Sequence, residues 1–201
     1  SWRNSDDGFV RDVHVSKLII DPNNNNVFYA TTQGATEYTD KVGDGAGVFK
    51  SNDRGNSWTQ INNGLDSLET NILTVDPNDS ETLYLGTDDD GVYKSTDGGE
   101  SWKKLTVSSL SKSFGVGDII VDPQNSNNIY IGTVDYFRLS ESRGVLGDFG
   151  VYKSTDGGAT WEEFNVGLNH LGVFSLELSE ENRILYAGTR AGGVYWISLD
   201  N

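Results

Sequence analysis

The chain has 201 residues and a formal net charge of −15 at pH 7, with 24 glycines, 11% aromatic residues and neither cysteine nor methionine. This length can bury a sizeable core as one domain, and the glycine and aromatic content is typical of an all-β protein with many tight turns. The acidic charge argues against nucleic acid and anionic membranes as partners. Disulfides cannot stabilise the fold, and no apolar run reaches the roughly 18 residues of a membrane span, so we expect no membrane insertion.

The first element along the chain is a short apolar strand, followed by an Asp-Pro turn and a second strand that contains a tyrosine. Consecutive apolar residues in such short strands are typical of strands that are buried on both faces. The element therefore predicts two paired strands, A and B. It occurs four times, with a degenerate turn in the last copy. The copies are Leu18–Pro22 with Val27–Thr31, Leu73–Pro77 with Thr82–Thr87, Ile119–Pro123 with Asn128–Thr133, and Leu176–Ser179 with Ile184–Thr189.

A second element, with the pattern Ser-x-Asp-x-Gly-x-Ser/Thr-Trp, follows three of these four copies. The Asp side chain can accept hydrogen bonds from main-chain N–H groups just ahead of it and close a tight turn. The Gly can adopt a positive φ without strain, and the Trp carries a large apolar surface into a core. With alternating residues on both sides, the pattern predicts a β-hairpin of strands C and D. The structural residues of the three copies are Ser51, Asp53, Gly55 and Trp58; Ser95, Asp97, Gly99 and Trp102; and Ser154, Asp156, Gly158 and Trp161.

This pattern resembles the Asp-box, or bacterial neuraminidase repeat, found in many β-propellers, including sialidases, xyloglucanase-type glycoside hydrolases and sortilin-type receptors. The resemblance implies a propeller, and four strands per repeat is also the make-up of one propeller blade. We therefore predict an all-β fold, a single β-propeller domain over residues 1–201 with four four-stranded blades. Function does not follow from this fold, because such relatives do unrelated things. The predicted blades span residues 9–62, 66–107, 114–166, and 170–201 together with 1–4.

Both ends of the chain bear on how the last blade is completed. Ser1-Trp2 stands where the end of an Asp-box would be, so residues 1–4 are predicted to form a strand D. Gly193–Trp196 reads as a strand C without a following Asp-box. The N-terminal strand can complete the chain's own last blade or that of a neighbour, which would give a dimer or polymer through strand exchange. The chain can also be a segment of a longer propeller.

The predicted binding face is the end of the blades where strand B connects to strand C, because both long insertions fall there. These insertions are Gln33–Ala46 and Val134–Phe149. Function often lies in loops that a rigid scaffold holds in place. Their aromatic residues could stack on sugar rings or anchor a protein, and Asp40 and Asp44, or the run Asp88–Asp90, could supply oxygen ligands to calcium. The candidate binding residues are Tyr38, Asp40, Asp44, Tyr136, Phe137, Arg138 and Asp148.

Three functional hypotheses follow. The first is an extracellular, non-catalytic propeller that binds a glycan or protein through the insertion face. The second is a structural oligomer or filament subunit that is joined through terminal strands. The third is a glycoside hydrolase propeller or part of one, which needs two carboxyl groups about 5–10 Å apart. Its weak candidates are Asp118 and Asp135, and the sequence itself gives no support for catalysis.

We predict no cofactor. Calcium is the one metal that the sequence suggests as possible, and its ligands are unknown. The chain lacks an initial Met, which we interpret as processing or fragmentation, and the former favours an extracellular or cell-surface location.

Overall fold

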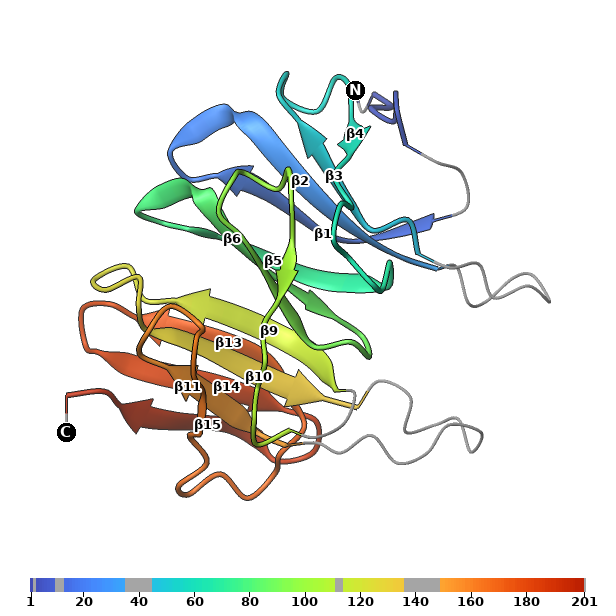
Figure 1. Cartoon of the computed structure of the whole chain (residues 1–201). Coiled ribbons are helices and arrows are strands. Elements are labelled where there is room, and N and C mark those ends of the chain that lie inside the picture. Colours follow the sequence, from blue (N-terminus) through green and yellow to red (C-terminus); the bar gives the residue numbers. More distant parts are fainter. Residues whose placement is uncertain (2, 10–12, 35–44, 111–113, 136–148, 201) are drawn as a thin grey trace, which may run out of the picture. The chain divides into compact units, whose positions relative to one another are not determined.

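The computed structural model describes residues 1, 3–9, 13–34, 45–110, 114–135 and 149–200. The chain forms two compact units, one of residues 1–87 and 93–104 and the other of residues 88–92 and 105–201. The elements of the described residues are antiparallel strands (Figure 1). No helix long and apolar enough to span a membrane occurs among them.

The first unit holds two four-stranded sheets, ordered β1-β2-β3-β4 and β5-β6-β7-β8. Each sheet contains one Asp-Pro turn, between its first and second strands, and one Asp-box, between its third and fourth strands. The strands are β1 (Val13–Asp21), β2 (Asn24–Gly34), β3 (Val48–Ser51), β4 (Thr59–Gln60), β5 (Thr70–Asp76), β6 (Asp79–Thr87), β7 (Val92–Ser95) and β8 (Lys103–Lys104).

The second unit holds a four-stranded sheet, β9-β10-β11-β12, and a three-stranded sheet, β13-β14-β15. The strands are β9 (Gly115–Val121), β10 (Ile129–Val134), β11 (Val151–Ser154), β12 (Glu162–Glu163), β13 (Val173–Ser179), β14 (Ile184–Thr189) and β15 (Gly193–Ser198). All strands fall within the four predicted blade ranges. The predicted all-β, four-bladed fold is confirmed, whereas a single domain over all 201 residues stays a prediction.

In each unit the two sheets pack through apolar faces. In the first unit one cluster joins Tyr29, Val48 and Ile61 of the first blade to Leu73, Leu83 and other apolar residues of the second blade. In the second unit a matching cluster joins Tyr130 and Val151 to residues of the fourth blade that include Leu176 and Leu185. In β5 and β9 the consecutive apolar residues are largely buried, as the sequence predicted. The same prediction is wrong for β1, where Leu18 and Ile20 are exposed, and for β13, where buried Leu176 and Leu178 alternate with exposed residues.

The N-terminal segment packs on the first blade as a preceding blade would. Its Ser5 carbonyl accepts the Trp58 indole N–H at 3.1 Å, and its Asp7 carbonyl accepts the Trp58 main-chain N–H at 2.8 Å. The second blade repeats both bonds, since the Ile61 carbonyl accepts the indole N–H and the Asn63 carbonyl accepts the main-chain N–H of Trp102. Residues 5–8 therefore occupy the positions of residues 61–64.

Residues 1–4 are predicted to complete the last blade. The described members of this segment, Ser1, Arg3 and Asn4, lie outside any strand, and the described part of the fourth sheet ends at β15. The location of Ser5 and Asp7 supports the register of this prediction, because it places Trp2, which lies outside the described residues, at the sequence position that corresponds to Trp58. The strand itself stays a prediction.

Candidate functional site

In the first unit the insertion between β2 and β3 has a base that is closed by Thr32. Its hydroxyl accepts the Ala46 N–H at 2.9 Å and donates to the Gly47 carbonyl at 2.9 Å. Glu69, which precedes β5 in the next blade, accepts the Gly34 N–H with one carboxylate oxygen at 2.9 Å and the Gly45 N–H with the other at 2.8 Å. The two ends of the insertion are therefore held together and fixed to the neighbouring blade.

The second unit closes its long insertion in the same way. The Thr133 hydroxyl accepts the Phe149 N–H at 3.0 Å and donates to the Gly150 carbonyl at 2.9 Å. Arg190, just after β14 in the next blade, donates from its guanidinium to the Asp135 carbonyl and lies over the Phe174 ring at 5.2 Å. The Glu69 carboxylate thus links the first insertion base to the next blade, and the Arg190 guanidinium links the second insertion base to the next blade.

Glycine is required where each strand C begins. Gly47 and Gly150 have φ values of 77° and 85°, and a Cβ there would lie 2.3 Å and 2.1 Å from the side-chain oxygens of Asn62 and Asn165. Asn62 accepts the Val48 N–H at 2.8 Å and donates to the Ala46 carbonyl at 2.9 Å. Asn165 makes the equivalent bonds in the third blade. In the first and third blades the start of strand C is therefore fixed by an amide side chain.

Sequence reasoning missed these supporting residues. The sequence ranges predicted for strand B all end in a threonine, but the residue of the first blade that corresponds to Thr87, Thr133 and Thr189 is Thr32 and not Thr31. The asparagines could have been found from the shared spacing of four residues after Trp58 and Trp161. Glu69 and Arg190 have no such signal, because each occurs in one repeat and binds main-chain groups far away in sequence.

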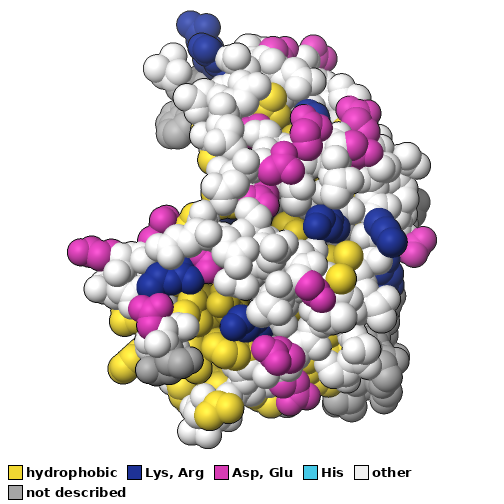
Figure 2. Space-filling view, turned by 60° about the vertical axis from the view of Figure 1, so that its left-hand side comes forward, with side chains coloured by type: hydrophobic (Ala, Val, Ile, Leu, Met, Phe, Trp, Pro, Cys, Tyr) yellow, Lys and Arg dark blue, Asp and Glu magenta, His cyan; other side chains and the backbone are white. Residues whose placement is uncertain are grey.

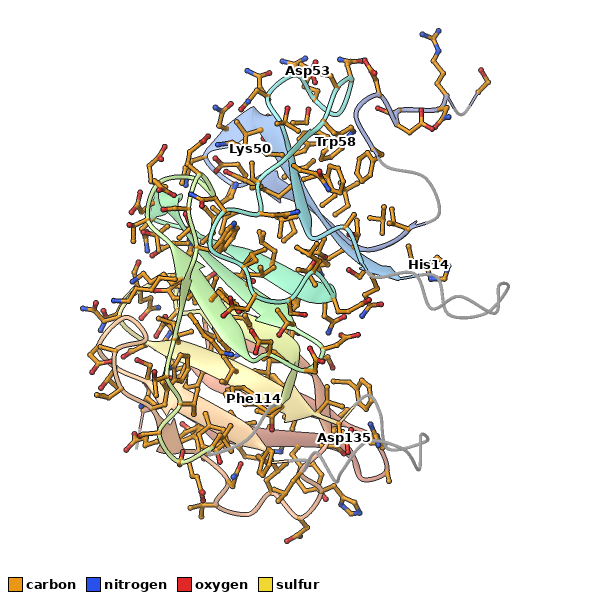
Figure 3. The ribbon with its side chains drawn as sticks, turned by 45° about the vertical axis from the view of Figure 1, so that its right-hand side comes forward. His14, Lys50, Asp53, Trp58, Phe114 and Asp135 are labelled. Atoms are coloured by element: carbon orange, nitrogen blue, oxygen red, sulfur yellow. The ribbon has the colours of Figure 1, made fainter. Side chains whose placement is uncertain are left out.

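The predicted binding residues fall in the insertions. Tyr38, Asp40, Asp44, Tyr136, Phe137, Arg138 and Asp148 all lie outside the described residues, so their role stays a prediction. Figure 3 shows where the insertions leave the blades, with His14 at that end of the first sheet and Asp53 and Trp58 away from it. His14 is exposed and pairs with Gln33 across β1 and β2. It is the titratable side chain of β1 nearest to the insertion.

The weak catalytic candidates both lie in the second unit. Asp118 accepts the Leu176 N–H of β13 with one oxygen at 2.8 Å and the Ile119 N–H with the other at 2.9 Å. These bonds make Asp118 a link between neighbouring sheets. Asp135 is 2% exposed, and its carbonyl is bound by Arg190. The burial of Asp135 keeps its carboxylate from a polymeric substrate, whereas Asp118 is partly exposed. A catalytic role for either residue stays a prediction.

The Asp-box residues form the same set of hydrogen bonds in all three boxes. In each box the serine hydroxyl donates to the aspartate and accepts the N–H of the glycine, at 2.8 Å for Gly55 and 2.9 Å for Gly99 and Gly158. The aspartate also accepts both the N–H and the hydroxyl of the Ser or Thr four residues on. These hydrogen bonds, led by the hydroxyl, lower the pKa of Asp53, Asp97 and Asp156 to about 2.

The described residues contain no group of three or more His, Asp or Glu side chains that could hold a metal ion. Asp40 and Asp44 lie outside this part of the chain, so calcium binding there stays a prediction. In the described run Asp88–Asp90, all three residues take part in further interactions.

Comparisons with known proteins agree with this fold. In an alignment over 96 positions, which covers 43% of the chain and 11% of the relative, the chain is 36% identical to the xyloglucanase Xgh74A of Acetivibrio thermocellus. The chain also superposes on an ancestral GH74 enzyme with 26% identity and a TM-score of 0.71, covering 96% of the chain and 23% of that structure. The Niastella koreensis GH74 enzyme is 27% identical with a TM-score of 0.66, and the superposition covers 92% of the chain and 28% of that structure.

The chain thus spans about a quarter of these two solved structures and a smaller part of the curated relative. One family model, described as sortilin, neurotensin receptor 3, matches residues 46–195, from the base of the first insertion to the strand C of the last blade. This match covers well over half of the sequence and includes all three Asp-boxes. The chain belongs to the Sortilin-Vps10 family.

Proposed function

We propose that the chain is part of a glycoside hydrolase propeller and that it binds a xyloglucan-type glucan at the insertion end of its blades. The observation that carries this proposal is the 36% identity to a xyloglucanase over 96 residues. It favours the third of the sequence-based hypotheses over a free-standing binding module. Since a plant-type polysaccharide is met outside the cell, the proposal includes an extracellular or cell-surface location.

The insertion bases support binding at this end. Each base is held by a threonine and by a charged residue of the next blade, Glu69 or Arg190. A loop anchored at both ends loses less conformational entropy when it binds a ligand. The aromatic residues Tyr38, Tyr136 and Phe137 in these loops offer flat apolar surfaces that suit sugar rings.

Hydrolysis would require two carboxyl groups with space for a sugar between them. Since Asp118 binds two main-chain N–H groups and Asp135 is buried, the proposal assigns neither to the reaction. Within the described residues the chain's contribution is the scaffold that presents the glucan-binding loops.

Calorimetry with xyloglucan oligosaccharides, and with cello-oligosaccharides for comparison, tests this proposal. The full chain should bind the former, and the double variant Tyr136→Ala, Phe137→Ala should weaken binding about tenfold, as expected for the loss of about 1.4 kcal/mol of stacking. Trp196→Ala is a matched control, because it removes an exposed aromatic side chain from β15. Absence of xyloglucan binding at millimolar concentrations, or an equal loss in the control, would contradict the proposal.

A further inference from the structure

Two basic residues of the second unit, Arg190 and His170, meet the short loop that joins β14 to β15 at the insertion end of the fourth blade. Arg190 begins this loop, and its main-chain N–H binds the Gly172 carbonyl at 2.8 Å. The Nδ1 atom of His170 lies 2.9 Å from the Tyr195 hydroxyl, and a Cβ on Gly192 would lie 2.4 Å from the same atom. The imidazole therefore packs against the end of the loop. Both basic side chains are exposed.

The Arg190 guanidinium is held by two contacts. It lies over the Phe174 ring, with 5.2 Å between the guanidinium carbon and the ring centroid, and such a contact between a cation and an aromatic ring is favourable. Its Nη2 donates to the carbonyl of Asp135, the residue that Figure 3 labels at the base of the second insertion. Both contacts are made within the fourth blade or to the third, so they do not depend on blades outside the chain. A guanidinium that is already held in place loses little side-chain entropy when a ligand binds.

This guanidinium has no acidic partner in the part of the chain that the structure describes. The chain has 30 acidic residues against 15 lysines and arginines, and acidic side chains are visible on both units in Figure 2. Nevertheless, no ion pair joins Arg190 to a described carboxylate, and neither its Nε nor its Nη1 has a described acceptor. The side chain therefore retains N–H donors that a ligand can use.

The other arginine of the fourth blade shows what such a group does with a carboxylate in this fold. Arg183 donates from both Nη atoms to the two carboxylate oxygens of Asp122. A planar guanidinium matches a carboxylate in this bidentate way, and hydrogen bonds between charged groups are stronger than those between neutral ones. Arg190 differs because no described residue supplies its carboxylate, which points to one that a ligand supplies.

His170 adds a second polar group beside the loop. In the second blade the tyrosine at the position of Tyr195 is Tyr93, whose hydroxyl accepts the main-chain N–H of Asp66 at 3.2 Å. In the fourth blade the tyrosine hydroxyl binds the imidazole instead. Because this bond uses Nδ1 and no described residue binds Nε2, the second ring nitrogen is available to a ligand.

We propose that Arg190 and His170 form a subsite for a carboxylate-bearing sugar, that is, for a uronic acid in the glycan that the insertion end binds. The carboxylate accepts two hydrogen bonds from the Arg190 guanidinium, and the sugar hydroxyls exchange hydrogen bonds with His170. The net charge of −15 repels anionic polymers in general, so this recognition depends on the local donors. The inference rests on the proposed function only in taking the ligand to be a glycan.

Calorimetry with two oligosaccharides of the same backbone tests the subsite. Cellotetraose and the β-1,4-linked tetramer of glucuronic acid differ at C6 of each sugar, where the latter has a carboxylate. The full chain should bind the glucuronate tetramer about tenfold more tightly than cellotetraose, as expected for charge-assisted hydrogen bonds to Arg190. This preference should shrink as salt is added, because salt screens the exposed charges.

Substitutions of Arg190 separate recognition of the carboxylate from support of the insertion. Arg190→Gln keeps a donor for the Asp135 carbonyl but removes the charge, so it should weaken binding of the glucuronate tetramer about tenfold and binding of a neutral xyloglucan oligosaccharide less than about twofold. Arg190→Lys keeps the charge without the planar fork and should retain part of the preference. Arg54→Gln is the matched control, because it removes an exposed arginine that binds Asn26 in the first unit. It should leave both ligands unaffected.

An Arg190→Gln variant that keeps the preference for glucuronate, or that weakens both ligands alike, would overturn the subsite. The wild-type measurements need no variant and separate the two proposals. A chain that binds xyloglucan oligosaccharides but binds glucuronate no better than cellotetraose contradicts the subsite alone. A chain that binds the glucuronate tetramer but no xyloglucan oligosaccharide contradicts the proposed function alone, and a chain that binds neither at millimolar concentrations contradicts both.

Discussion

The buried ion pair between Asp122 and Arg183 offers a sharp test of how the turns of neighbouring blades are joined. Arg183 donates to both carboxylate oxygens of Asp122, at 2.9 Å and 2.6 Å. The Asp122 side chain is 0% exposed and that of Arg183 17%. Asp122 also accepts the Gln124 N–H at 3.0 Å and so closes its own Asp-Pro turn.

The perturbation is Arg183→Ala. Removing one partner of a buried pair costs about 3–5 kcal/mol, because the remaining charge is desolvated without compensation. We expect about 3 kcal/mol at pH 7, since Asp122 keeps its bond from Gln124. Arg183 also has a φ of 49°, so Arg183→Gly is the matched control for backbone strain. It should lose slightly less stability than Arg183→Ala.

The pH dependence follows from the pKa of Asp122. Burial raises this pKa, but hydrogen bonds from Arg183 and Gln124 outweigh burial and lower it in the folded chain. A lowered pKa stabilises the fold above the unfolded value of about 3.9, and this stabilisation is lost as the pH falls. In Arg183→Ala burial dominates and the pKa rises, so the difference between variant and wild type should shrink from pH 7 to pH 4.

Urea unfolding followed by circular dichroism measures these differences. Asp122→Asn combined with Arg183→Ala should recover part of the loss, because no buried charge remains. A loss below 1 kcal/mol for Arg183→Ala, or a double variant no more stable than the single one, would refute the reasoning.

Three further predictions concern the repeated motifs and the insertion base. The low pKa of the Asp-box aspartates, about 2 for Asp97, stabilises the folded chain above about pH 3.9, so the melting temperature should fall as the pH drops from 4 to 2; an Asp97→Asn variant should fall less steeply, and an equally steep fall would contradict this. Trp102→Ala should cost about 3–5 kcal/mol in urea unfolding, because a 5% exposed indole leaves a cavity, whereas exposed Lys103→Ala should cost under 0.5. Glu69→Ala should speed amide exchange at Gly34 and Gly45, and Glu69→Gln less so; unchanged exchange in both variants would show that the clamp is dispensable.

Much of the fold could be predicted because its signals are local. The Asp-box contains donor, acceptor and glycine within eight residues, so a short window of sequence specifies the turn. The glycine positions expected at positive φ are confirmed, at 81° for Gly55 and 92° for Gly99. Four repeats then predict four blades without any knowledge of how distant strands pair.

The missed features depend on contacts between repeats. The fourth turn is degenerate in sequence, so nothing in it predicts that Arg183 binds Asp122. In the first unit the same position is linked differently, since the Ser80 hydroxyl donates to Asp21 at 2.8 Å. Glu69 was likewise unremarkable among 30 acidic residues. Such partners emerge only when the sheets are placed against each other.

The threonine at the end of strand B allows the loop that follows it to change without changing the blade. In the fourth blade Thr189 donates to the Gly193 carbonyl at 3.0 Å and accepts the Gly192 N–H at 3.1 Å. Thr32 and Thr133 make the same pair of bonds around much longer loops. The pair of hydrogen bonds at the base is the same whatever the length of the loop. A loop can therefore lengthen, shorten or be transplanted between blades while the strands beneath it keep their register. New recognition surfaces can therefore be tried on this scaffold one loop at a time.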